Sequence, residues 1–360
     1  MSFLYLLSAV FMLLFLITVH ELGHFYAARW CKIPVKEFAV GFGWKFFQWK
    51  GKKHDTVYVL RCIPFGGYCM FYGEDEVDDQ KRKDPRSIGN FSVLKRLIVT
   101  FMGPLVNLLL ALVLCFGFFS IAGIPTVSGV EMSISSVVEA SPAAQAGLQE
   151  GDQPIKVNGE DANAMQADGV INLFKHIEAY KVGDAPLELI VLRNGEEVTL
   201  HATPTENNEE KRMMIGATFT QQFQNEMVRT NIINSFTYSF NFCVEQGKMI
   251  ADALFNLFKG IGFDNMAGPV GIVNMISTQT QQAGFVAYLS MIILISVNLG
   301  ILNLVPFPGL DGSRILLLLV EAVRKKPLNQ KIEAYIHLAG FAAFILLFIA
   351  LTYQDILRLF

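Results

Sequence analysis

The chain has 360 residues, of which 52% are hydrophobic and only 17% are charged, and its mean hydropathy is +0.40. This composition excludes an ordinary soluble protein, which carries a larger share of charged residues. The formal net charge of -3 is close to neutral and gives no sign of a nucleic-acid partner, so we expect none.

The apolar residues are concentrated in four segments, each long enough, or nearly so, to cross about 30 Å of hydrocarbon as a helix. These segments are residues 3–19, 97–121, 286–305 and 336–351. The first has no basic leading region and no small-residue cleavage site, so we interpret it as a retained helix. The sequence therefore predicts a multi-pass α-helical membrane protein with four transmembrane helices, surrounded by membrane lipid.

A His-Glu-Leu-Gly-His sequence at residues 20–24 directly follows the first apolar segment. On a helix, His20 and His24 lie one turn apart on one face, so both imidazoles can bind one metal ion while Glu21 lies beside it. Such side chains are costly at membrane depth and usually face the interior of a helix bundle. The alternative is a pair of histidines that extend to the interface from a helix end.

The segment between the first two spans is predicted to form a membrane-associated β-hairpin at about residues 35–72. Part of it alternates between polar and apolar residues, and its glycines favour tight turns between short strands. Residues 74–86 mix acids and bases, which predicts a solvated loop. This segment also holds most of the basic residues, and a second basic cluster at residues 324–326 precedes the last span. The positive-inside rule therefore places both loops in the cytoplasm and the segment between spans two and three outside.

Residues 130–204, between spans two and three, are predicted to form a small α/β domain with a hairpin turn at residues 193–196. The stretches Ser-Pro-Ala-Ala-Gln-Ala-Gly-Leu at 141–148, Gly-Asp at 151–152 and Val-Asn-Gly at 157–159 resemble the bacterial PDZ domain. The resemblance implies a module that binds extended peptides by adding a strand to its sheet. Pro154 departs from that pattern, because it removes one backbone donor.

Apolar residues at steps of three or four predict an amphipathic helix over residues 232–258. We expect this helix on the outer surface of the membrane. The alternative is a helix that packs in the core of the soluble domain, because amphipathicity alone does not separate the two cases.

A catalytic zinc site needs three protein ligands and one open position, so a third ligand must come from another segment. The candidates are Asp311 and, less favoured, His337. Asp311 follows Pro306 and Pro308, which must interrupt a spanning helix, and such a break persists only where it is buried in protein or lines a watery cavity. His337 has the simpler interpretation of a polar residue at the start of the last span.

This ligand set predicts Zn²⁺ as the cofactor and hydrolysis as the reaction. Zinc lowers the pKa of water toward neutrality, and Glu21 can accept the proton and deliver it to the leaving amine of a peptide. Asn107 and Asn303 are candidates for hydrogen bonds to the substrate backbone or to a metal ligand.

Several motifs together resemble the site-2 protease family of intramembrane metalloproteases, in its bacterial branch of sigma-factor regulators. They are residues 20–24, Phe-Gly-Gly-Tyr at 65–68, Gly-Pro at 103–104 with Asn107, Gly-Pro-Val-Gly at 268–271, and the run from Asn303 to Asp311 and Gly312. The resemblance covers nearly the whole chain, and the motifs follow one another in the same order as in that family. It implies that His20, His24 and Asp311 bind zinc, that Glu21 is catalytic, and that a single PDZ domain lies outside the cytoplasmic membrane. Ser313 replaces a glycine common in that family.

We divide the chain into four parts on this basis. Residues 1–125 and 285–360 form the transmembrane catalytic parts, 126–206 the PDZ domain, and 207–284 amphipathic linker helices. The expected substrates are single-span membrane proteins, such as anti-sigma factors or remnant signal peptides, cut near the cytoplasmic side. A strand edge of the hairpin between residues 57 and 68 is expected to pair with the unwound substrate.

Two other classes of function remain at this point. A metal or solute transporter also contains broken helices and an acid at mid-membrane, although paired breaks in two halves are not evident. An inactive scaffold that binds peptides through the PDZ-like domain would not require Glu21.

Overall fold

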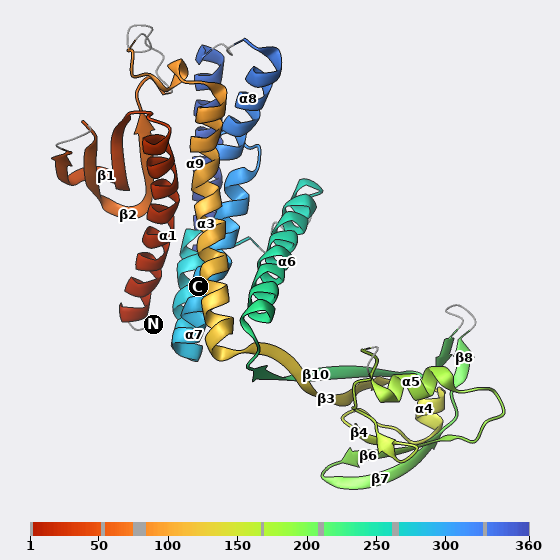
Figure 1. The fold of residues 1–360 in the computed structure, drawn as a ribbon. Coiled ribbons are helices and arrows are strands. Elements are labelled where there is room, and N and C mark those ends of the chain that lie inside the picture. The colour runs from red at the N-terminus through yellow and green to blue at the C-terminus, as the bar shows by residue number, and fades with distance from the viewer. Residues whose placement is uncertain are drawn as a thin grey trace. The chain divides into compact units, whose positions relative to one another are not determined.

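The computed structural model describes residues 3–51, 55–74, 84–166, 169–207, 212–260, 266–326 and 330–359. The chain divides into two compact units (Figure 1). The first, which we call the membrane unit, comprises Met1–Phe119 and Ile232–Phe360, and the second, the inserted unit, comprises Ser120–Asn231.

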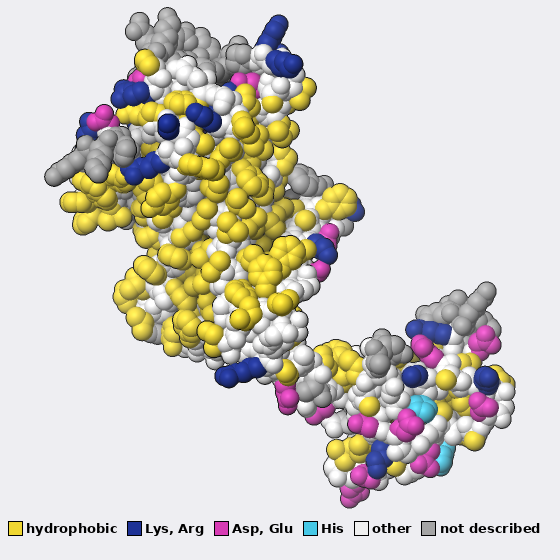
Figure 2. Space-filling model, in the orientation of Figure 1, with side chains coloured by type: hydrophobic (Ala, Val, Ile, Leu, Met, Phe, Trp, Pro, Cys, Tyr) yellow, Lys and Arg dark blue, Asp and Glu magenta, His cyan; other side chains and the backbone are white. Residues whose placement is uncertain are grey.

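Four long apolar helices in the described residues can each cross a membrane. They are α1 (Phe3–Trp30), α3 (Val93–Ala122), α7 (Pro269–Leu304) and, within α9 (Gln330–Leu359), residues Leu338–Arg358. Only 12% to 28% of each apolar window is buried inside the protein, and apolar side chains cover much of the membrane unit in Figure 2. The predicted multi-pass membrane fold is confirmed.

Close contacts at glycine join the membrane helices. A Cβ atom on Gly23 of α1 would lie 2.6 Å from the carbonyl oxygen of Met102 in α3. A Cβ atom on Gly300 of α7 would lie 2.7 Å from the Leu108 side chain of α3. Because neither residue has a side chain, α1 and α7 both approach α3 closely, as small residues allow in membrane proteins.

Helix α7 turns back on itself at Gly284, whose φ of 65° and ψ of -146° suit glycine alone. Val273 and Ile295 pack in the same buried cluster, although a continuous helix would separate them by about 33 Å. Residues 285–304 therefore form the spanning part, close to the predicted span 286–305. The first part begins against Asp355 of α9, which is buried and accepts the backbone N–H groups of Gly268 at 3.0 Å and Gly271 at 2.7 Å.

The predicted hairpin is confirmed as strands β1 (Val35–Lys50) and β2 (Val57–Phe71), which pair antiparallel (Figure 1). Both strands bend at glycines with positive φ, namely Gly41 and Gly43 in β1 and Gly66 in β2. The bends divide the sheet into four adjacent runs, in the order 45–50, 57–61, 37–40 and 67–71. Residues 67–71 of β2 are thus an edge, with no further strand paired beside them among the described residues.

Sheets and two short helices form the inserted unit. Strand β3 (Ile124–Val137) pairs with β10 (Ala217–Val228), and β8 (Thr205–Asn207) pairs with β9 (Arg212–Met214). The remaining strands form a sheet in the order β5 (Glu160–Asp161), β4 (Gln153–Val157), β6 (Leu187–Arg193) and β7 (Glu196–Ala202). Helices α4 (Pro142–Gln145) and α5 (Asn172–Ala179) complete the unit, and α5 contributes Leu173 and Ile177 to its core. The predicted hairpin turn is present, because Asn194 and Gly195 both have positive φ.

Helix α6 (Ile232–Phe258) has the bounds that its apolar stripe predicts. It belongs to the membrane unit. The rings of Tyr238 and Phe242 contact the Phe119 ring of α3 edge-on, with ring centres 4.7 and 5.9 Å apart. The alternative of a core helix of the soluble domain is therefore wrong. Its position on the outer membrane surface stays a prediction.

A short 3-10 turn, η1 (Ile88–Asn90), precedes α3, and helix α8 (Asp311–Arg324) follows α7. As predicted, the helix is interrupted at Pro306 and Pro308, since α7 ends at Leu304 and α8 begins at Asp311. The first turn of α8 lies against the end of α7, because a Cβ atom on Gly312 would lie 2.3 Å from the Leu304 carbonyl oxygen.

Candidate metal centre

His20 and His24 lie one turn apart on the same buried face of α1, each only 7% exposed. Their Nε2 atoms are 3.2 Å apart. His20 is ten residues from Trp30 at the end of the span, which is about 15 Å along a helix. Both imidazoles are buried against protein, whereas the interface alternative has them extend from the helix end.

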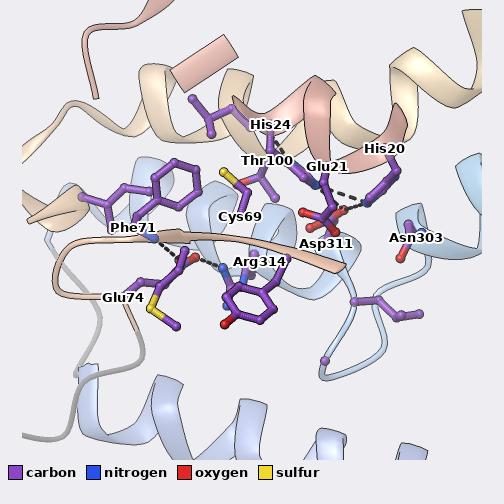
Figure 3. Close-up of a pocket in the computed structure, with 16 residues that line it drawn as sticks. His20, Glu21, His24, Cys69, Phe71, Glu74, Thr100, Asn303, Asp311 and Arg314 are labelled. Atoms are coloured by element: carbon purple, nitrogen blue, oxygen red, sulfur yellow. Dashed lines mark hydrogen bonds and ion pairs between the residues drawn. The ribbon is translucent and has the colours of Figure 1, made fainter. Parts of the chain in front are cut away.

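Asp311, at the first residue of α8, completes the cluster (Figure 3). Its Oδ2 atom lies 3.1 Å from His20 Nε2 and 3.2 Å from His24 Nε2. The break between α7 and α8 thus places a carboxylate against α1, as the proline pattern suggests. The side chain of His337 lies outside the described residues.

These three side chains fit a zinc ion. They are the one group of three potential metal ligands found within the described residues. Ligands at about 2.0–2.1 Å from a tetrahedral zinc lie about 3.3 Å apart, which is close to the three observed separations of 3.1 to 3.2 Å. Asp311 Oδ2 is buried and has no hydrogen-bond partner in the described part of the chain, so a shared cation would satisfy it.

Helix α3 orients His24. The Nδ1 atom of His24 donates to the backbone carbonyl of Val99 at 2.9 Å, which leaves Nε2 as the lone-pair atom facing Asp311. A Cβ atom on Gly103 would lie only 2.2 Å from His24 Nε2. The absence of a side chain at Gly103 therefore makes room for the imidazole.

Glu21 lies beside this cluster without being part of it (Figure 3). Its carboxyl group is within hydrogen-bonding reach of the Cys69 backbone amide in β2. A Cβ atom on Gly67 would lie 3.4 Å from Glu21 Cγ, so the edge of the hairpin passes close to the carboxylate. Burial, together with the charge of Glu21, raises the pKa of the Cys69 thiol.

A cavity of about 360 Å³ joins these residues to Tyr68, Asn303 and Arg314. Asn303 lines the cavity and donates to the Leu299 carbonyl at 2.9 Å. Asn107 is fully buried and does not line it, so Asn303 is the asparagine that can meet a substrate here.

Sequence reasoning missed Glu74. The charge pattern predicts a solvated loop at this residue, but its side chain is only 12% exposed, lines the cavity and forms an ion pair with Arg314 of α8. That interpretation is wrong for Glu74, and residues 75–83 of the same stretch lie outside the described residues. The charge-rich neighbourhood gives no local signal that would set Glu74 apart.

Residues 8–347 match the family described as peptidase family M50. The chain belongs to this family. The zinc metalloprotease RasP of Bacillus licheniformis is 28% identical, and the alignment covers 97% of this chain and 98% of that protein. The regulator of sigma-W protease RasP of Bacillus subtilis is also 28% identical, over 96% of each chain. A putative zinc metalloprotease of Clostridium acetobutylicum is 30% identical over 99% of this chain and 98% of that protein.

The M50 family is the site-2 protease family that the motifs resemble, and this membrane protein is a zinc metalloprotease that acts on proteins. The transporter and scaffold alternatives are therefore set aside. The group of His20, His24 and Asp311 can bind a metal ion, as zinc chemistry requires.

Proposed function

We propose that this chain is an endopeptidase that hydrolyses a peptide bond within the spanning segment of single-span membrane proteins. The observation that carries this proposal is the position of Glu21, which lies on the apolar helix α1 and lines one cavity with His20, His24 and Asp311. The cavity supplies polar groups at a depth where hydrocarbon offers none, and hydrolysis requires water there.

We assign His20, His24 and Asp311 as the zinc ligands and Glu21 as the general base and acid. Zinc bound there would supply a Lewis acid that lowers the pKa of water and polarises a carbonyl. Glu21 accepts the proton of the attacking water and then delivers it to the leaving amine. Its carboxyl group lies within hydrogen-bonding reach of the Cys69 amide, and Asn303 can bind the substrate backbone.

We propose that the substrate is presented as an added strand. A helical segment hides its carbonyls in its own hydrogen bonds, so the substrate must unwind before it is cut. Within the predicted range 57–68, residues 57–60 cannot be the docking edge, because they pair with residues 37–40 on one side and 47–50 on the other. The run 67–71 is the edge that passes Glu21, so a strand added there would bring its carbonyls to the catalytic group.

The basic residues between α1 and α3 and at the end of α8 favour a cytoplasmic position for these segments. We therefore propose that the catalytic site opens near the cytoplasmic side of a bacterial cytoplasmic membrane and that the inserted unit, proposed to be a PDZ domain, lies outside. The substrate class that fits is a membrane-bound regulator such as an anti-sigma factor, or a remnant signal peptide. The name of the Bacillus subtilis relative, a regulator of sigma-W protease, supports the former.

The test compares wild type, Glu21→Gln and His24→Ala in detergent with a single-span test substrate, and measures cleavage and bound zinc together. Glu21→Gln is expected to lower the cleavage rate by roughly 10²- to 10⁴-fold while zinc remains bound. His24→Ala is expected to lose zinc and cleavage together. Glu139→Gln, an exposed acid of the inserted unit, is the matched control. Unimpaired cleavage by Glu21→Gln would overturn the proposal.

A further inference from the structure

A second cavity, of about 570 Å³, lies at the end of α1 and shares no lining residue with the metal centre. Three cations line it: Arg29 and Lys32 at the end of α1, and Arg86 from the segment before η1. The one acid that lines it is Asp55.

The cations of this cavity exceed the acids. Asp55 is paired with Lys50 at 2.8 Å, and Arg86 donates to both carboxylate oxygens of Asp84. Neither Arg29 nor Lys32 has a carboxylate within 4.0 Å in the described ranges. Two positive charges therefore face the cavity without a protein counter-ion among these residues.

The two guanidinium groups are held in place before any ligand arrives, whereas only the backbone is fixed at Lys32. The guanidinium of Arg29 lies 4.4 Å from the centre of the Phe25 ring, and that of Arg86 lies 4.0 Å from the centre of the Tyr72 ring. Arg29 uses Nη2 to donate to the Tyr58 hydroxyl at 2.9 Å, and a guanidinium has five N–H donors. The backbone at Lys32 is set by the helix end, where Ile33 N donates to the Ala28 carbonyl at 2.8 Å.

Two exposed aromatic residues on the last turns of α1, which carries Arg29 at its end, favour a position of this helix end near the membrane interface. Tyr26 and Trp30 on the last turns of α1 are 63% and 75% exposed, and such residues mark the level of lipid headgroups. Lys and Arg side chains also gather near this end of the membrane unit in Figure 2. The dipole of α1 favours a cation at its end, which accounts for Arg29 but not for Arg86, which comes from another segment.

We propose that this cavity binds the phosphate group of an anionic phospholipid headgroup. Planar guanidinium groups recognise phosphate through paired hydrogen bonds, and lysine adds a point charge. A phosphate shared by Arg29 and Arg86 links the end of the helix that carries His20 and His24 to the segment that follows the hairpin. The site is therefore a place where lipid composition can act on the arrangement of the membrane unit.

The test uses the full chain in detergent and counts bound lipid by native mass spectrometry, with phosphatidylglycerol against phosphatidylcholine of the same acyl chains. The double variant Arg29→Gln/Lys32→Gln is expected to bind phosphatidylglycerol roughly 30-fold more weakly, from the usual contribution of two basic residues. Phosphatidylcholine binding should not change. Arg86→Gln, which leaves α1 intact, should weaken phosphatidylglycerol binding by roughly fivefold.

The matched control is Lys95→Gln/Arg324→Gln, which removes the same charge outside the cavity. Lys95 of α3 is next to Arg96, and Arg324 of α8 is one turn from Glu321. Because Arg96 and Glu321 form an ion pair, Lys95 and Arg324 belong to the same region of the membrane unit. An equal loss of phosphatidylglycerol in this control, or no preference for phosphatidylglycerol in the wild type, would overturn the proposal. Displacement of the lipid by millimolar inorganic phosphate would assign the cavity to free phosphate, and retention of the lipid would assign it to the headgroup.

Discussion

Glu74 and Arg314 form an ion pair across the cavity of the metal centre and join strand β2 to helix α8 (Figure 3). Glu74 also accepts the backbone N–H of Phe71 at 2.9 Å, so its carboxylate is tied to the end of the edge run. Arg314 lies one turn along α8 from Asp311. The pair therefore connects the strand that meets Glu21 with the helix that carries the third proposed zinc ligand.

We predict that reversing either charge, as Glu74→Arg or Arg314→Glu, lowers kcat by roughly 10- to 100-fold, because small misplacements of catalytic groups have effects of this size. Zinc content should change little, since neither residue belongs to the ligand cluster. The double reversal should recover most of the activity, as expected for two residues that act on each other. Cleavage and zinc are measured on the same preparations, and full activity in both single variants would contradict this prediction.

Gly103 provides a second test, because it makes room for His24. In Gly103→Ala, the new methyl group would lie 2.2 Å from His24 Nε2, so the imidazole must leave its place. We predict loss of bound zinc and of cleavage, measured by elemental analysis and by turnover of a test substrate.

Gly117→Ala is the control for this change, because it lies on the same helix and nothing lies within 4 Å of its added Cβ atom. The two variants gain the same helix propensity, which favours alanine by roughly 1 kcal/mol. Gly117→Ala should retain zinc. Equal zinc contents in the two variants would show that the space at Gly103 is not what positions His24.

Local patterns were sufficient to predict the spans and the two histidines of the candidate metal site. The spacing of His20 and His24 has meaning on any helix, and the apolar segments require no partner to be recognised. Asp311 could be proposed because Pro306 and Pro308 break a helix wherever they occur. What could not be read from the sequence is the distance between Asp311 and α1, which depends on the packing of α1, α3 and α7.

The features that the sequence does not predict are contacts between residues far apart in the chain. Strand β10 pairs with β3 across about ninety residues, from Val137 with Ala217 to Ile124 with Val228. This pairing joins the beginning of the inserted unit to its end, so the unit spans residues 120–231. Alternation in either strand alone does not name its partner. Glu74 is a similar case, since its partner Arg314 is 240 positions away.

The edge formed by residues 67–71 predicts a periodic effect of backbone changes in the substrate. Successive backbone N–H groups of a strand point to opposite sides. Single N-methyl groups placed along a synthetic substrate should therefore slow cleavage at alternate positions near the cut bond, where an N–H group pairs with the edge. The readout is the relative cleavage rate at each position, with a side-chain methyl of equal size as the control. A uniform effect along the substrate would count against strand pairing.

Asp152 and Arg193 make the stability of the inserted unit depend on pH. The Asp152 side chain is 1% exposed and accepts from Arg193 Nε at 2.8 Å and Nη2 at 2.7 Å, and from the Gln149 backbone N–H at 2.9 Å. Burial raises the pKa of this carboxyl, and the hydrogen bonds from Arg193 and Gln149 lower it. The second effect is larger, so the net shift of the pKa is downward. The ionised form is therefore the one that the fold stabilises.

This stability is present above the unfolded pKa of about 3.9 and is lost as the pH falls through the lower folded value. We predict that amide protection in residues 120–231, followed by hydrogen exchange and corrected for intrinsic rates, declines below about pH 4. Asp152→Asn should lower the opening free energy at pH 7 by about 3 kcal/mol, because Arg193 then lacks its charged partner. Glu196→Gln, at an exposed position of the same hairpin, should have little effect. A wild-type protection that stays constant to pH 2 would show that Asp152 is not held in its ionised form by the fold.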